Sequence, residues 1–144
     1  MTSYFIDEAA IEIPEGRPIV DRTVHVLEVP GSDGSADLRL VVERETIAEG
    51  KTLAARVDKR LADHATKLRG FTVLGEERKT LGGLPALVVR ARWRHPRGLV
   101  HTVEAHVAAR GRHLALLASA RVELAEACDA WAASIFESIR FRDA

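Results

Sequence analysis

Apolar and polar residues alternate with a period of two along most of this chain, which is the pattern of half-buried β-strands. Short clusters of Gly and Pro separate the alternating runs. A first run, residues 10–16, stops at Pro14, so we expect only a short strand there. We expect further strands over residues 23–31, 37–44, 71–81, 84–93, 99–109 and 112–119, and a short last strand over 139–141.

Two segments change to the helical period of 3.6 residues. The first helix is predicted over residues 52–70, with Thr52 as the N-cap and Gly70 just after the C-terminus. Its apolar stripe is Leu53, Val57, Leu61, Ala65 and Leu68. The second helix is predicted from about Val122 to Glu137. Its buried stripe is Leu124, Cys128, Trp131 and Ile135.

The order of these elements is strands, helix, β meander, helix and a short strand, which predicts the α+β class rather than βαβ winding. Gly82-Gly83 and Arg110-Gly111 are signals for two-residue hairpin turns. The length of 144 residues suits one domain over residues 1–144. We therefore expect a twisted antiparallel sheet packed on two helices, with both helices on the same face.

Apolar residues fall on both faces of the predicted sheet, whereas a sheet with one solvated face would alternate cleanly. Register follows from turn length, so the meander divides into two sets. One face carries Val89, Ala91, Trp93, Val100, Thr102, Ala115 and Leu117, and the other carries Val88, Val103, Ala105, Val107, Leu114 and Leu116. In residues 23–31, Val24 and Val26 point away from Leu27 and Val29. Either both faces are covered, one by the helices and one by loops or a dimer partner, or the second face is a groove for an apolar ligand or helix.

Composition and charge limit the kinds of partner and the compartment that we expect for this protein. Lys+Arg and Asp+Glu both number 21, so the chain lacks the basic excess of a general nucleic-acid binder. Zero net charge removes one defence against self-association and favours a dimer. The single Cys128 favours a reducing compartment. The N-terminus has no signal-peptide pattern, and no run approaches about 18 apolar residues. We expect a cytoplasmic protein that inserts into no membrane.

The residues that could carry chemistry form no catalytic or metal-binding motif. His101 and His106 differ by five and face opposite ways on a strand, and the six histidines are expected at surfaces or edges. Cys128 lies on a buried stripe, where a thiol is inert. The carboxylates show no partner arrangement in the sequence; they are Glu43, Glu45, Glu76, Glu77 and Glu104. The basic stretch 90–97 is expected to be a solvated hairpin. We expect no enzyme, metal or cofactor.

The order and spacing of several stretches resemble the DcrB-like family, and within it the Eag chaperones, the effector-associated proteins of type VI secretion. The stretches are IPEGRPIVDRTVHVLEVPG, LRLVVERETIAEGKTLAARVDKRLADHATKLRGF, TLGGLPALVVRARWRHPRGLVHTVEAHVAARGRHLALLASA and SIFESIRFRDA. The resemblance implies a PsbP-like fold and no catalysis. It implies a homodimer that binds the hydrophobic N-terminal segment of a secreted effector, shields its transmembrane helices before export and supports loading on the secretion spike. The alternative is a non-catalytic structural or oligomerisation module of the DcrB/PsbP-like group.

The resemblance also implies an effector-binding groove with apolar strand positions and one helix face. The groove residues it predicts are Val24, Val26, Val41, Arg60, His64, Leu68, Val100, Thr102 and Glu104. Arg60, His64 and Leu68 follow each other at four-residue spacing and are expected to form its wall. Arg60 and Thr102 stand where family members carry glutamines, so the hydrogen bonds offered to a client helix would differ here.

Overall fold

The computed structural model describes residues 2–6, 9–16 and 22–142 of the chain. Eight strands and two α-helices follow one another in these parts. They are β1 (Thr2–Ile6), β2 (Ala9–Ile13), β3 (Arg22–Pro30), β4 (Ala36–Thr46), α1 (Leu53–Lys67), β5 (Thr72–Leu81), β6 (Leu84–His95), β7 (Gly98–Ala109), β8 (Arg112–Arg121) and α2 (Ala125–Glu137), with a 3₁₀ turn (Val122–Leu124) before α2. The α+β class and the antiparallel sheet with two helices are confirmed. The strand β1 had no counterpart among the predicted elements.

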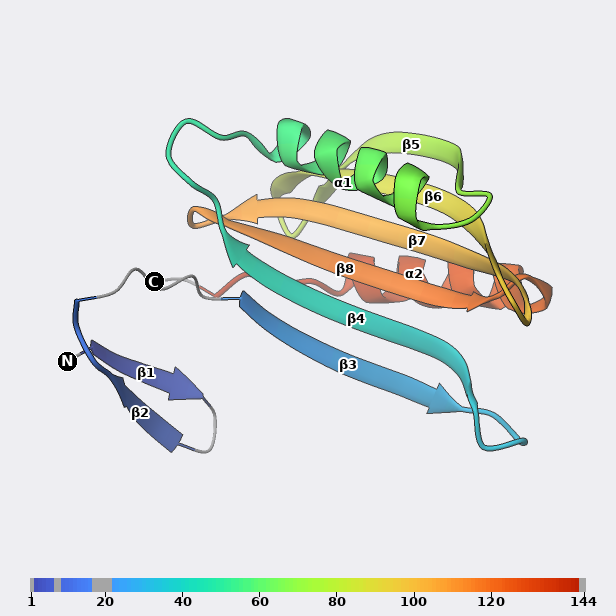
Figure 1. The fold of residues 1–144 in the computed structure, drawn as a ribbon, viewed down its shortest axis with the longest axis horizontal. Helices are drawn as coiled ribbons and strands as arrows, with labels where there is room; N and C mark the ends of the chain where they lie inside the picture. The colour runs from blue at the N-terminus through green and yellow to red at the C-terminus, as the bar shows by residue number, and fades with distance from the viewer. Residues whose placement is uncertain (1, 7–8, 17–21, 143–144) are drawn as a thin grey trace.

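Six strands form one antiparallel sheet in the order β3-β4-β8-β7-β6-β5, and β1 and β2 form a separate hairpin (Figure 1). The two predicted hairpin turns close as expected, with positive φ at Gly82, Gly83, Arg110 and Gly111. The turns fix the register: Ala91 lies opposite Thr102, and Thr102 lies opposite Ser119. The predicted division of the meander into two apolar faces is therefore confirmed.

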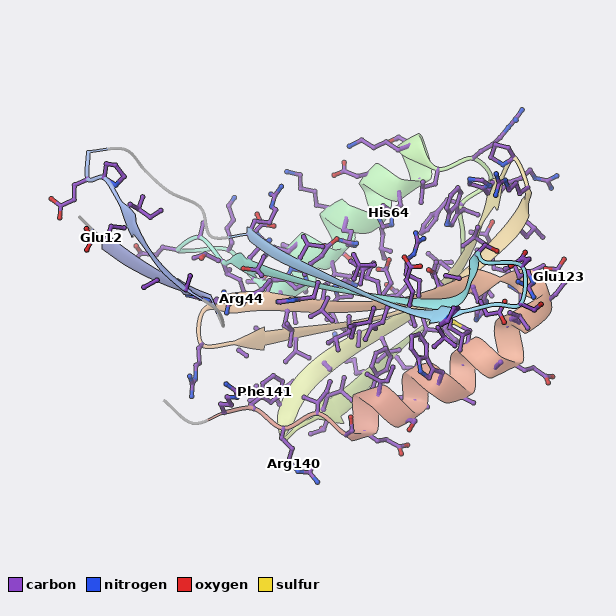
Figure 2. The ribbon with its side chains drawn as sticks, turned by 90° about the horizontal axis from the view of Figure 1, so that it is seen from below. Glu12, Arg44, His64, Glu123, Arg140 and Phe141 are labelled. Carbon is purple, nitrogen blue, oxygen red and sulfur yellow. The ribbon has the colours of Figure 1, made fainter. Side chains whose placement is uncertain are left out.

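The two helices lie on opposite faces of the sheet, so the expectation that both cover the same face is wrong (Figure 2). The face under α2 carries the apolar core. It joins Val103, Ala105 and Val107 of β7 with Leu116 and Ala118 of β8, and with Cys128, Ala132 and Phe136 of α2. Five of these residues, Ala105, Val107, Ala118, Cys128 and Ala132, are completely buried. Their small side chains let α2 lie close to the sheet.

The helix α1 is attached to its face of the sheet in a different way. The side chain of Thr52 accepts a hydrogen bond from the amide of Ala55 and caps the start of this helix, as predicted. Gly70 adopts a φ of 65° two residues beyond the C-cap, Leu68. Val57 is the one buried residue of α1, while Leu53, Leu61, Arg56, Arg60 and His64 are half-buried.

The last predicted strand, over residues 139–141, is absent, because residues 139–142 form no ladder with the sheet. Ile139 and Phe141 instead pack their side chains against the core. The ring of Phe141 lies over the β5–β6 turn, where it would be 2.6 Å from a Cβ atom at Gly82. Apolar contact, rather than strand pairing, holds this segment in place. Within the described residues no helix is long and apolar enough to cross a bilayer.

Candidate functional site

A groove of about 500 Å³ runs between α1 and the edge strand β3, above β4 and β8. Val24 and Ala115 line its floor. Its walls are charged: Glu43 and Glu45 belong to β4, Arg22 belongs to β3, and α1 contributes the other charged side chains. The α1 residues are Arg56, Lys59, Arg60, Asp63, His64 and Lys67. The groove therefore has a small apolar floor between two polar rims.

Apolar side chains continue from the groove floor along the same face of the sheet. Val26 lies opposite Val41, and Val41 lies opposite Leu117. Together with Val24 and Ala115, these residues form what we call the apolar strip. Val24 and Val26 are 51% and 53% exposed. The strip is exposed to solvent at β3 and becomes buried toward α1.

The structure places the nine predicted groove residues on the α1 side of the sheet or on α1 and its C-cap. Val24, Arg60 and His64 line the groove itself. Val26 and Val41 extend its floor, and Glu104 meets Arg60 beneath the helix. Val100 and Thr102 lie farther along β7, opposite Arg121 and Ser119, and Leu68 caps α1; these three do not line the groove.

A chain of ion pairs and hydrogen bonds, which we call the α1 network, fastens α1 to the sheet. The guanidinium of Arg60 lies 3.0 Å from Glu43 and 3.6 Å from Glu104. Glu104 is 4% exposed, and its Oε2 lies 3.0 Å from Nε2 of His106. Arg56 lies 3.2 Å from Glu45. The two arginines of α1 thus reach carboxylates on β4 and β7.

Two hydrogen-bonded histidines, His106 and His113, continue the α1 network, and their tautomers follow from their partners. Nε of Arg56 donates to Nδ1 of His113 at 3.1 Å, so that nitrogen must be the acceptor. Nε2 of His113 then donates to Nδ1 of His106 at 2.8 Å. Nε2 of His106 is left to donate to Glu104. Both imidazoles are neutral in this arrangement, and each of their four nitrogens has a partner.

Burial and charge set the protonation of this network. Burial lowers the pKa of His113 from 6.5 to about 4, and the positive charge of Arg56 acts in the same direction. Burial alone would raise the pKa of Glu104, but the hydrogen bond from His106 and the charge of Arg60 outweigh it and hold that pKa below its usual value. Burial also lowers the pKa of His64. At neutral pH Glu104 is therefore ionised and His113 is neutral.

Two expectations from the sequence are corrected here. His101, His106 and His113 are buried, not at surfaces or edges. Glu43, Glu45 and Glu104 do have partners, all supplied by this face. One signal was available: residues two apart on a strand share a face, so Glu104 and His106 had to be neighbours.

A third buried histidine, His101, lies on the opposite face, which confirms that His101 and His106 point in opposite directions. Nε of Arg92 donates to Nδ1 of His101 at 3.2 Å, and Nε2 of His101 lies 2.7 Å from Asp129 of α2. This arrangement ties α2 to β6 and β7. In the described residues no group of three or more His, Cys, Asp or Glu side chains could hold a metal ion.

The sheet and helices define an α+β protein of the PsbP-like kind, and solved structures share this fold. A Pseudomonas aeruginosa protein of unknown function, described as a putative regulator, matches with a TM-score of 0.76 and 19% identity over 99% of this chain and 98% of its own. LpqN of Mycobacterium tuberculosis, involved in cell envelope biogenesis, matches with a TM-score of 0.58 and 14% identity over 84% and 90% of the two chains. The cyanobacterial PsbP of Synechocystis matches with a TM-score of 0.57 and 14% identity over 86% of this chain and 94% of its own.

The sequence itself identifies the family. The DcrB family model matches residues 8–138, so the chain belongs to the DcrB family. No curated protein matches the sequence at a significant level.

Proposed function

We propose that this DcrB-family protein is a cytoplasmic, non-catalytic chaperone of the Eag type. Its client would be the hydrophobic N-terminal segment of a type VI secretion effector, held until export and presented to the secretion spike. The observation that carries the proposal is the apolar strip, which lies open to solvent beside α1. Family membership and the motif order described above support the same assignment.

The strip suits a transmembrane helix because such a helix exposes large apolar side chains in water. Shielding each of them is worth about 1.5–3 kcal/mol, less the ordering cost of association. Val24 and Val26 can take part without unfolding, because each is already half exposed. A client helix lying along β3 and β4 would run beside α1.

The charged rim would keep the client in register rather than add to the apolar contact. Arg60 and His64 are on the α1 side of the groove, and Glu43 faces them from β4. Arg60 stands at one of the glutamine positions of the family and is already engaged by Glu43 and Glu104. We expect Arg60 to hold α1 in position rather than to form hydrogen bonds with the client's backbone.

The test uses capture of an apolar helix. The chain is co-expressed with the N-terminal fragment of an effector that carries predicted transmembrane segments, and complex formation is measured by co-purification. Val26→Asp should abolish capture, while Leu27→Asp, which changes an equally exposed residue on the other face of β3, should leave it intact. Circular dichroism confirms that both variants fold.

Loss of capture in both variants, or in neither, would refute the strip as the binding surface. A wild-type chain that leaves the fragment insoluble would refute the chaperone role and favour the non-catalytic oligomerisation module instead.

A further inference from the structure

The basic stretch of residues 90–97 divides into two parts in the structure. Arg90 and Arg92 are engaged on the α2 side, where Arg90 lies 3.7 Å from a carboxylate of α2 and Arg92 donates to a histidine of β7. Arg94 and Arg97 lie beyond them, at the end of β6 and in the β6–β7 turn, and both are exposed. Among the described residues, no side chain pairs with the guanidinium group of Arg94 or of Arg97.

The loop that follows α1 brings two more cations to the same end of the sheet. The backbone amide of Arg94 donates to the carbonyl oxygen of Arg69 at 2.7 Å, so this loop runs beside the end of β6. Lys67 is the last residue of α1. Arg69 and Lys67 are also exposed, and the described part of the chain offers neither of them an acidic partner within ion-pairing distance.

We call these four cations, Lys67, Arg69, Arg94 and Arg97, the basic end. Figure 1 shows that the β6–β7 turn lies at the right-hand end of the sheet, toward which α1 also runs. The basic end therefore gathers four exposed cations from two segments that are far apart in the sequence.

Two large apolar side chains accompany the basic end. Leu99 of β7 lies directly opposite Arg94 in the strand ladder and is 38% exposed. Trp93 precedes Arg94 and is half-buried, with its ring in an edge contact with that of His95. Leucine and tryptophan side chains among arginines and lysines are typical of protein surfaces that lie in the headgroup region of a bilayer.

We propose that the basic end docks on the surface of a bilayer that contains anionic lipids. Charge complementarity supports this partner, because each cation near such a surface strengthens binding about fivefold, and four cations act together here. The 21 basic and 21 acidic residues of the chain cancel, so the attraction is concentrated at this end. The strands β6 and β7 then point toward the bilayer.

Leu99 distinguishes a bilayer from a nucleic acid as the anionic partner. An exposed leucine is removed from water when it enters the boundary between headgroups and acyl chains, whereas a nucleic-acid backbone is bound through charged and polar groups. The docking does not depend on a client, because only Lys67 of the four cations also lines the groove.

Co-sedimentation with vesicles tests the docking, using the full chain without any client. We expect wild type to sediment with vesicles of equal parts phosphatidylcholine and phosphatidylglycerol, and to stay in solution with vesicles of phosphatidylcholine alone. High salt should release the bound protein, because salt screens exposed charges. Arg94→Glu and Arg97→Glu should each weaken binding at least about tenfold, since each replaces an attraction with a repulsion.

Lys51→Glu is the matched control. It makes the same change of charge at an exposed lysine that precedes α1, and it should change binding less than about twofold, because that site lies far from the basic end. Leu99→Ser should weaken binding to the anionic vesicles several-fold and leave the salt dependence as in wild type. Circular dichroism confirms that all variants fold.

Three results would overturn the proposal. The first is a wild type that stays in solution with the anionic vesicles. The second is a loss of binding in Lys51→Glu as large as that in Arg94→Glu. The third is a short DNA duplex that binds as tightly as the vesicles and is unaffected by Leu99→Ser, which would identify a general polyanion site. Failure of client capture with vesicle binding intact would overturn the proposed function alone.

Discussion

Acidification should destabilise this protein through His113, which lies beneath α1 and is 7% exposed. Its pKa is lowered from 6.5 to about 4 by burial and by the positive charge of Arg56. The unfolded chain therefore binds a proton at residue 113 between these two pH values, while the folded chain does not. Stability must fall as pH decreases from about 6.5 and level off below about 4.

The size of the effect follows from the two pKa values. One pKa unit corresponds to about 1.4 kcal/mol, so His113 should cost the folded state about 3 kcal/mol between neutral pH and pH 4. That is a large fraction of the 5–15 kcal/mol that is typical of a domain. Glu104, whose pKa is also lowered, acts in the same direction, because its contribution is lost once the folded carboxylate is protonated.

The assay compares wild type with His113→Gln in urea denaturation between pH 4 and pH 7. A glutamine offers one N–H donor toward His106 and one oxygen acceptor toward Arg56, as the neutral imidazole does. We expect the variant to lie within about 1 kcal/mol of wild type at pH 7 and to lose about 3 kcal/mol less on acidification. Equal pH dependence of the two proteins would refute the assignment of a neutral, buried His113.

Three further predictions concern other parts of the fold. Burial raises the pKa of the Cys128 thiol to about 11, so a thiol reagent at pH 8 should label it only after denaturation. Gly82→Ala should cost about 1–2 kcal/mol more than Gly83→Ala in thermal unfolding, because both positions have positive φ but only the first meets the ring of Phe141. Asp129→Ala should cost about 2–3 kcal/mol and the asparagine variant less, because alanine leaves a buried imidazole N–H without an acceptor; urea titration measures both, and equal losses would contradict this role.

The alternation of apolar residues predicted the strands and the register well, because two-residue turns leave little freedom. Gly82-Gly83 and Arg110-Gly111 set the pairing of four strands, and the division into two apolar faces followed directly. Sequence reasoning could not assign a helix to a face, since both faces carried valines and leucines. The sequence therefore predicts both helices on one face of the sheet, whereas in the structure they lie on opposite faces (Figure 2).

The buried histidines were missed for a different reason. A histidine counts as a polar residue in any hydropathy pattern. Its burial is energetically tolerated only when hydrogen-bond partners satisfy both ring nitrogens. Two of these partners lie in helices far away in the sequence: Asp129 of α2 for His101 and Arg56 of α1 for His113. The pair of Glu104 with His106 could be predicted from spacing.

The α1 network bears on the candidate site because it fixes where α1 lies. An α1 with an apolar underside would gain by covering the apolar strip, since Val24 and Val26 would then be removed from water. Arg56 and Arg60 instead tie the helix to Glu45, Glu43 and Glu104. These ion pairs are half-buried and are weak evidence for stability, because desolvation offsets much of their attraction. Their clearer consequence is positional: they hold α1 to one side and leave the strip on β3 and β4 open to a partner.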